Sequence, residues 1–405
     1  MNTIFRSSYA RGARYRDLVK VHGAPLLVLD VGTVVEQYVA LRNALPGVEL
    51  FYAVKSLPHP EILQVLANAG SGFDIASTGE IELLRNLHIA PRRTIHTHPI
   101  KRDSDIRDAL RFGCTTFVVD NMDEVIKFLP FKYRVGLFLR ISFSSADAVV
   151  DLSKKFGLAV DEAADLLLLA ARLGVHVKGI CFHVGSQCVN SQAQLEAINA
   201  CNTLIRQHRN TGAAPISILD IGGGFPISYD NRGVDITAYC GPIRQALSNL
   251  PPYVRVIAEP GRFISGPSMT CITTVIGKAR RQGLNWYYLD EGVYGSFSGQ
   301  LFDHMHYPLE IFSDDTSLHD SVLAGPTCDS IDLVAEDIQL PELQLGDPVV
   351  GHMMGAYTAA SATAFNSLKK AKVVVLRQGA VTVAGGESTG AIPDISNPDA
   401  RGPWH

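Results

Sequence analysis

Short apolar runs alternate with segments of helical periodicity between about residue 50 and residue 262. This alternation is typical of a parallel sheet whose strands are joined by helices. We count roughly eight runs, a number that indicates a closed barrel rather than an open sheet. The runs are YAVK (52–55), FDIA (73–76), TIHTH (94–98), TFVVD (116–120), VGLFLRIS (135–142), VKGICFHV (177–184), ISILDIG (216–222) and VRVIAE (254–259).

Helix boundaries between these runs are predicted from their end residues. One helix is expected from Pro60 to a stop at Gly70, and another from Asp161 to a stop at Gly174. Both carry an apolar stripe at helical spacing, so each is expected to cover one face of the barrel.

The pattern changes after about residue 265. Stretches such as MTCITTVIGKA (269–279) and LNWYYLDEGVYGSF (284–297) are strand-like and contain few helical periods. The early run APLLVLD (24–30) is expected to join them. The sequence therefore predicts an α/β protein, with a barrel domain over 31–265 and a β-domain built from 1–30 and 266–405. The tail from about Gly385 is expected to be loosely docked.

Composition narrows the class of protein. The chain has 405 residues, of which 46% are hydrophobic and 19% charged, so a large core can be buried. The net charge of -4, without a continuous basic stripe, makes nucleic acid and anionic membranes unexpected partners and favours small molecules. No apolar segment is long enough to cross a membrane, and the N-terminus lacks a signal-peptide core, so a cytosolic protein is expected.

The seven cysteines show no paired CxxC spacing. This argues against a disulfide framework and against a structural zinc site, so no metal is expected. Most of the thiols are expected to be buried, and only Cys328 has neighbours that suggest chemistry.

Chemically distinctive residues stand where the apolar runs end. They include Lys55, Asp74, Arg140, His183 and Glu259. In a barrel, catalytic groups collect at the C-terminal ends of the strands. An amine, an aromatic ring and a carboxylate in these places, together with a glycine cradle, are what a phosphorylated aromatic cofactor requires.

Three of these residues also have a plainer interpretation. Lys55 can form a Schiff base if desolvation lowers its pKa, but a solvated loop lysine is the alternative. His183 can stack on a ring or be a satisfied core histidine. Glu259 can pair with a protonated pyridine nitrogen, or form a structural salt bridge to Arg140 or Arg262.

Gly222, Gly223 and Gly224 follow a predicted strand. Three glycines allow backbone N–H groups to approach a phosphate closely, although a plain tight turn fits equally well. The spacing does not match a dinucleotide fingerprint. Gly261 and Arg262, just past the next strand, can contribute a further N–H group and a cation.

The segment from Gln282 to Leu368 contains thirteen Asp and Glu but no Lys or Arg. A stretch of one charge favours a cationic ligand. Asp303 and Asp329 lie among apolar and aromatic residues, whereas Asp314 and Asp315 are interpreted as solvated.

Taken together, these motifs resemble the fold type III pyridoxal-phosphate decarboxylases, in particular the ornithine decarboxylases and the bacterial lysine/ornithine enzymes. The resemblance covers nearly everything from about residue 24 to 370. It implies a TIM-like (β/α)8 barrel with a C-terminal β-domain, as in alanine racemase, and a homodimer with shared active sites. The matching stretches are YAVKS, FDIAS, LRIS, KKFG, FHVGSQ, DIGGGFP, AEPGRF, DEGVYGSF, FDHMHYP, GPTCDSID and MGAYTAASATAFN.

The resemblance also implies a role for each residue. Lys55 would bind pyridoxal 5'-phosphate covalently, Glu259 would pair with its ring nitrogen and His183 would stack on the ring. Cys328 would donate a proton after CO2 leaves, reaching in from the partner subunit with Asp329. The phosphate would be held by Ser186, Gly222, Gly223, Gly224, Gly261, Arg262 and Tyr357, Asp74 and Arg140 would support Lys55, and Asp303, Asp329 and Tyr357 would bind substrate.

The expected activity is decarboxylation of a basic L-amino acid, ornithine first and lysine second, as in polyamine biosynthesis. Diaminopimelate decarboxylases carry Cys-Glu-Ser where this chain has Cys328, Asp329 and Ser330, and need a cation that the acidic segment lacks. Another specialised diamino acid stays open as a substrate. A regulatory homologue without activity is the alternative from another class, although such chains are expected to lose cofactor residues that are present here.

Overall fold

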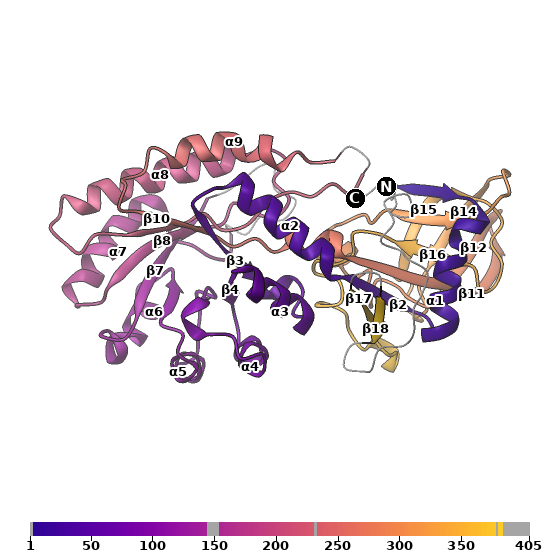
Figure 1. Ribbon diagram of the computed structural model, residues 1–405, viewed down its shortest axis with the longest axis horizontal. Helices are drawn as coiled ribbons and strands as arrows, with labels where there is room; N and C mark the ends of the chain where they lie inside the picture. The colour runs from indigo at the N-terminus through magenta and orange to yellow at the C-terminus, as the bar shows by residue number, and fades with distance from the viewer. Residues whose placement is uncertain (1–2, 144–153, 231–232, 378–379, 384–405) are drawn as a thin grey trace. The chain divides into compact units, whose positions relative to one another are not determined.

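The computed structural model describes residues 3–143, 154–230, 233–377 and 380–383 (Figure 1). By its internal packing the chain divides into two compact units. We call Val35–Pro226 with Val234–Ile264 the barrel unit, and Met1–Val34 with Ile227–Gly233 and Ser265–His405 the β unit. The predicted tail from about Gly385 lies outside the described residues.

The barrel unit contains eight parallel strands that close in the order β10-β3-β4-β5-β6-β7-β8-β9. All eight predicted runs contribute a strand, which confirms the closed barrel. Their bounds are β3 (Val48–Ala53), β4 (Gly72–Ile75), β5 (Thr94–His96), β6 (Thr116–Val119), β7 (Gly136–Ile141), β8 (Val177–Phe182), β9 (Ile218–Asp220) and β10 (Arg255–Ala258).

One boundary differs from its prediction. Strand β3 begins four residues before the predicted run and ends at Ala53, so Lys55 lies in a 3-10 turn, Val54–Ser56. Glu49 hides the early part of the strand from a hydrophobicity pattern. Its carboxylate accepts a hydrogen bond from Arg255 Nη2 of the neighbouring strand β10 at 2.6 Å. Glu49 is therefore a charged residue within a strand, which a search for apolar runs does not detect.

Apolar side chains from seven of the eight barrel strands, β3 and β5 to β10, pack into one buried cluster, as expected for a closed barrel. The cluster comprises Ile95, Val118, Phe138, Cys181 and Ile257, with Phe51 and Ile218 packed against it.

Helices connect the strands and lie outside them, as Figure 1 shows for α3 to α9. Helix α3 has Pro60 in its first turn and ends at Gly70 with φ of 98°, and α7 is followed by Gly174 with φ of 70°, so both predicted ends are confirmed. The bounds are α2 (Val31–Ala44), α3 (Pro60–Ala69), α4 (Thr78–Asn86), α5 (Asp103–Phe112), α6 (Met122–Lys127), α7 (Val160–Arg172), α8 (Gln192–Arg209), α9 (Ile236–Leu247) and α10 (Arg262–Ser265).

The β unit contains a ten-stranded mixed sheet among its described residues. Strand β2 pairs with β11 in antiparallel register, Leu29 opposite Met269, which confirms that the early apolar run joins the later strands. The bounds are β1 (Ile4–Ser7), β2 (Leu26–Asp30), β11 (Met269–Arg281), β12 (Leu284–Leu289), β13 (Leu309–Phe312), β14 (His319–Ala324), β15 (Leu333–Leu340), β16 (Pro348–Gly351), β17 (Lys372–Arg377) and β18 (Ala380–Val383), with helices α1 (Ala13–His22) and α11 (Gly299–Phe302).

None of the helices within the described residues is long and apolar enough to cross a bilayer.

A buried carboxylate fastens the edge of this sheet. Glu310 on β13 is 3% exposed and accepts hydrogen bonds from Ser7 Oγ of β1 at 2.5 Å and from His352 Nε2 at 2.9 Å. Burial raises the pKa of Glu310, but the hydrogen bonds from His352 and Ser7 and the charge of Arg11 outweigh burial and hold it below its usual value.

We expect Glu310→Gln to lower the free energy of unfolding at pH 7 by about 1 to 3 kcal/mol, because a charge-assisted pair becomes a neutral one. A depressed pKa stabilises the fold above the unfolded-state pKa, so the difference from wild type should shrink as pH falls below about 4.3 and vanish below the lowered native pKa. Urea unfolding at several pH values measures it. The control is Glu336→Gln at an exposed position of β15, and an equal loss in both variants would contradict the role of Glu310.

Candidate active site

The C-terminal ends of the barrel strands bring the predicted residues of the barrel unit to one mouth. Lys55 follows β3, Asp74 lies in β4, Arg140 in β7, His183 follows β8 and Glu259 follows β10. These residues are far apart in sequence, and the closed strand order makes them neighbours.

Lys55 is held by a buried carboxylate. Its ammonium forms an ion pair with Asp74 Oδ2, and the hydroxyl of Thr97 donates to the other oxygen, Oδ1. The Asp74 side chain is fully buried, whereas 42% of the Lys55 side chain is exposed. Asp74 therefore orients the amine of a side chain that remains partly exposed.

His183 is a neutral ring. Burial, with the positive charges of Arg140 and Lys55, lowers the pKa of His183 to about 3. Its Nδ1 accepts a hydrogen bond from the backbone N–H of Gly185 at 3.1 Å, which fixes the ring. An uncharged imidazole can stack on a cationic aromatic ring without electrostatic repulsion.

The glycine triplet occupies space in which no side chain fits. A Cβ atom on Gly222, which has φ of 64°, would lie 2.2 Å from the carbonyl oxygen of Phe182. A Cβ on Gly223 would lie 2.8 Å from the carbonyl of Glu259, and one on Gly224 2.6 Å from that of Gly185. The triplet is thus more than a flexible turn, because the ends of β8 and β10 pack directly against it.

Arg262, Ser186 and Gly261 are further candidates for binding a phosphate. Arg262, buried at the start of α10, donates from Nε to Ser186 Oγ at 3.1 Å. Gly261 lies between β10 and α10. A buried guanidinium, a hydroxyl and a glycine loop form a donor set suited to a phosphate.

Among the residues that the structure describes, no cation forms an ion pair with Glu259. Burial, with the negative charges of Asp220 and Asp74, raises the pKa of Glu259 well above its ordinary value, and Lys55 opposes this only in part. A cation placed against this carboxyl would reverse that shift. A protonated pyridine nitrogen is such a cation.

The remaining predicted residues lie in the β unit. Cys328 donates from Sγ to Asn366 Oδ1 at 3.4 Å, and Tyr294 OH donates to Asp329 Oδ2 at 2.6 Å. Asp303 caps the C-terminus of α11, and Tyr357 adopts φ of 55° in the segment after β16.

Asp332 anchors the loop that carries Cys328. This carboxylate is 2% exposed and accepts from Val293 N at 2.8 Å, Thr327 N at 3.0 Å and Thr327 Oγ1 at 2.7 Å. Asp290, another acid of the segment from Gln282 to Leu368, is structural too, since it accepts hydrogen bonds from the hydroxyls of Thr273 and Thr274. Only some of the Asp and Glu side chains in this segment are therefore available to a cationic ligand.

The cysteines divide as predicted. Cys328 is exposed, and the other six thiols are buried and take part in no disulfide, namely Cys114, Cys181, Cys188, Cys201, Cys240 and Cys271. Within the described residues, no group of three His, Cys, Asp or Glu side chains is placed to hold a metal ion.

Three residues of the barrel mouth were missed by sequence reasoning. Asp220 and Thr97 stand at the end of apolar runs, the same signal that identified Asp74. Lys101 is 3% exposed and donates to three carbonyls, those of His98, Pro99 and Val118, at 2.9, 2.7 and 2.6 Å. Burial lowers the pKa of Lys101 to about 8, and the residue fixes the turn after β5.

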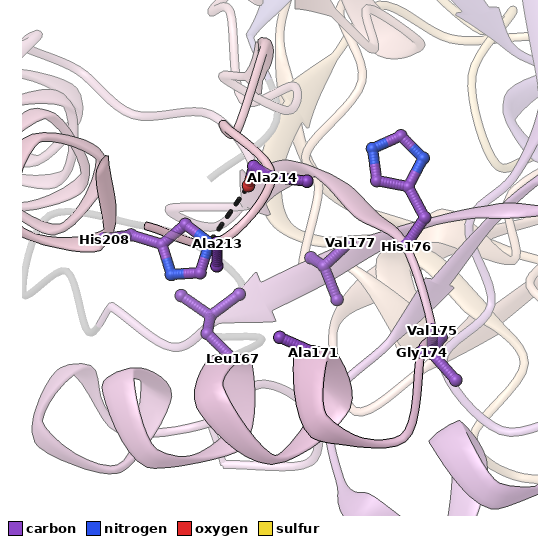
Figure 2. A pocket seen from close by; sticks show the side chains of 9 residues that line it. All are labelled: Leu167, Ala171, Gly174, Val175, His176, Val177, His208, Ala213 and Ala214. Carbon is purple, nitrogen blue, oxygen red and sulfur yellow. Dashed lines mark hydrogen bonds between the residues drawn. The ribbon is translucent and has the colours of Figure 1, made fainter. Parts of the chain in front are cut away.

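A separate hollow of about 310 Å³ lies near Val177, at the opposite end of β8 (Figure 2). Figure 2 shows His176 and His208 beside it, with His208 Nε2 3.2 Å from the carbonyl oxygen of Ala214. Its remaining lining is aliphatic or glycine, so this hollow has none of the donors gathered at the mouth.

Comparison with known proteins relates this chain to a family of decarboxylases. Residues 31–266 match the family model described as pyridoxal-dependent decarboxylase, pyridoxal binding domain. A lysine/ornithine decarboxylase of Selenomonas ruminantium is 39% identical over 362 residues, which cover 89% of this chain and 91% of that protein. Antizyme inhibitor 2 of Xenopus laevis is 36% identical over 85% of this chain and 79% of that protein.

A solved structure extends the likeness to three dimensions. The lysine/ornithine decarboxylase of Vibrio vulnificus, crystallised with putrescine and also with cadaverine, superposes with a TM-score of 0.86. Its identity is 48%, and the match covers 90% of this chain and 97% of that one.

The chain belongs to the pyridoxal-dependent decarboxylases of fold type III, in the group that includes the lysine/ornithine decarboxylases. Its cofactor is pyridoxal 5'-phosphate. The described residues fit this group: a glycine loop that a Cβ would fill, a buried arginine and a serine for a phosphate, and the Glu259 carboxyl, which has no ion-pair partner among the described residues.

Gly222→Ala is expected to prevent retention of the cofactor and to cost roughly 2 to 4 kcal/mol of stability, because it adds a backbone clash to the strain of positive φ. Gly212→Ala is the matched control, since Gly212 has φ of 75° and a Cβ atom on it would meet no other atom within 4 Å. It should cost only about 1 kcal/mol and retain the cofactor.

Urea unfolding and cofactor absorbance measure both variants. Equal behaviour of the two variants would mean that the close contact with Phe182 has no importance.

Proposed function

We propose that this chain decarboxylates a basic L-amino acid, with L-ornithine the first candidate and L-lysine the second. The observation that carries the proposal is the 48% identical enzyme of Vibrio vulnificus, which was crystallised with putrescine and with cadaverine. Those diamines are what remains of ornithine and lysine once CO2 has left.

In this proposal the barrel domain, residues 31–265, holds the cofactor. Lys55, kept in place by Asp74 and with Arg140 nearby, binds the cofactor aldehyde. Glu259 would accept a hydrogen bond from the protonated ring nitrogen, and His183 would cover the ring as a neutral imidazole. The bound cofactor supplies an electron sink for the pair released when the bond to the carboxylate breaks. The phosphate contacts are assigned to Ser186, Gly222, Gly223, Gly224, Gly261, Arg262 and Tyr357.

The β unit contributes the substrate side. Asp303 and Asp329 receive the distal ammonium, with Tyr357 beside them, and Cys328 delivers a proton to the α-carbon. We propose that the chain forms a homodimer in which Cys328 and Asp329 enter the partner's site. The exposure of the Cys328 thiol supports this arrangement, because a thiol buried in its own subunit could not reach a neighbour. The cytosolic location stays a prediction.

Two alternative functions can be judged from specific observations. Diaminopimelate decarboxylation would need a cation for a second carboxylate, and the acidic segment offers none while Asp329 is an acid. A role in binding a protein partner is suggested by the likeness to antizyme inhibitor 2. Against it stand Lys55, His183, Glu259, Arg262 and Cys328, the full set that turnover needs.

A panel of four amino acids tests the substrate. We expect CO2 release from ornithine and lysine, which differ by one methylene and so by about 10- to 200-fold in kcat/KM. Arginine and meso-diaminopimelate should be poorer, the latter because its distal carboxylate meets two aspartates. Activity on meso-diaminopimelate alone would refute the charge argument, and no release from any of the four would favour the binding role.

Cys328→Ala should leave cofactor binding unchanged and slow amine formation by about 100- to 10,000-fold, because a general acid is lost. Product analysis together with cofactor absorbance measures both effects. The control is Ser330→Ala at an exposed position of the same loop. An unaltered rate and product would remove Cys328 from the mechanism.

Mixing Cys328→Ala with Lys55→Ala subunits separates shared from self-contained sites. A shared site predicts partial recovery of activity, because one site of a mixed dimer receives both native residues. No recovery in dimers shown to be mixed would contradict the shared arrangement.

A further inference from the structure

Asp220 is a buried carboxyl group for which the proposed function has no role. It is the last residue of β9, 0% exposed, and pairs in register with Ile257 of β10. Beyond it the two strand ends stay joined, since Ile221 N donates to Ile257 O at 2.9 Å and Glu259 N to Gly222 O at 2.7 Å. This register brings the side chains of Asp220 and Glu259 together.

The two oxygens of Asp220 have different surroundings. Oδ1 accepts from the backbone N–H of Gly222 at 2.9 Å. Among the residues that the structure describes, no donor reaches the buried Oδ2. The Asp220 and Glu259 carboxyl groups lie close enough for each to shift the pKa of the other. Two such groups hydrogen-bond to each other only when one of them is protonated.

We propose that Asp220 is a positioning residue that shares one proton with Glu259 and so links this carboxyl to the glycine loop. The proposal rests on the proposed function only for the pairing of Glu259 with the cofactor ring. When a ring N–H cation lies against Glu259, the proton resides on Asp220, which then donates to Glu259. Asp220 thus positions both Glu259, which is assigned to the ring nitrogen, and the loop of Gly222, which is assigned to the phosphate.

The electrostatics of the mouth agree with one shared proton. Burial raises the pKa of Asp220 to about 7, and burial with the Asp220 charge raises that of Glu259 well above its ordinary value. Adjacent carboxyls cannot both ionise cheaply. The other charged or titratable groups around the pair are Asp74, Lys55, Arg140, Cys181 and His183.

Asparagine reproduces the protonated form of Asp220. Its amide oxygen can accept from Gly222 N–H and its NH2 group can donate to Glu259, whereas leucine of similar size can do neither. We expect Asp220→Asn to bind pyridoxal 5'-phosphate within about threefold of wild type, and Asp220→Leu to bind about 10- to 100-fold more weakly. Absorbance titration of the full chain, freed of cofactor and refilled, measures the dissociation constants.

A second measurement detects the proton itself. In wild type the native pair keeps a proton that the unfolded chain has released, so stability should fall as pH rises from about 4 to about 7. Asp220→Asn should make this slope of the unfolding midpoint shallower, because one raised carboxyl is removed and its charge no longer adds to the effect of burial on the pKa of Glu259. Glu259→Gln should leave the pKa of Asp220 raised by burial, so only the double variant should remove the slope contributed by the pair.

Asp120→Asn is the matched control. Asp120 follows β6, is buried, and accepts hydrogen bonds from Gly157 N at 3.0 Å and Asn121 Nδ2 at 2.8 Å. Its partners are amides rather than a carboxyl, so this variant should keep the wild-type slope.

The proposal is overturned if Asp220→Asn keeps the wild-type slope, or if Asp220→Leu binds cofactor as wild type does. Neither measurement uses a substrate. If none of the four amino acids is decarboxylated, the shared proton is not contradicted. If Asp220→Asn keeps the wild-type slope, the proposed substrate is not contradicted.

Discussion

Burial of carboxyl groups at the mouth of the barrel is the constraint on which the rest of the structure depends. Asp74, Asp220 and Glu259 are withdrawn from water on neighbouring or nearby strands, where an unpaired charge is costly. Lys55 and Thr97 satisfy Asp74. The Asp220 and Glu259 pair has no such cation among the described residues, so it must hold a proton or receive a positive ligand.

The glycine loop follows from the same arrangement. Glu259 and Asp220 meet only because β9 and β10 stay in register past their ends, with Glu259 N bonded to Gly222 O. That register presses the backbone of β8 and β10 against residues 222–224, where a Cβ atom has no room. One packing arrangement therefore supplies both the carboxyl pair for a ring nitrogen and an open backbone for a phosphate.

In the β unit, the acidic segment serves two purposes. Asp332, Asp290 and Glu310 are saturated by hydroxyl, imidazole or backbone donors and hold loops and strands together. Asp329 accepts from the hydroxyl of Tyr294 and from Ile331 N of its own loop, beside an exposed thiol. Residue type alone therefore does not distinguish a structural acid from one available to a ligand.

The sequence by itself determined the eight barrel strands, the helix ends at Gly70 and Gly174, and the polar residues at strand ends, because these depend on local hydrophobic period and on glycine stereochemistry. Tertiary structure alone decided that Asp220 faces Glu259, that Thr97 completes the Asp74 site, and that Asp332 is an anchor. Those contacts join segments separated by tens of residues. Strand register and donor geometry create them, and no local pattern encodes either.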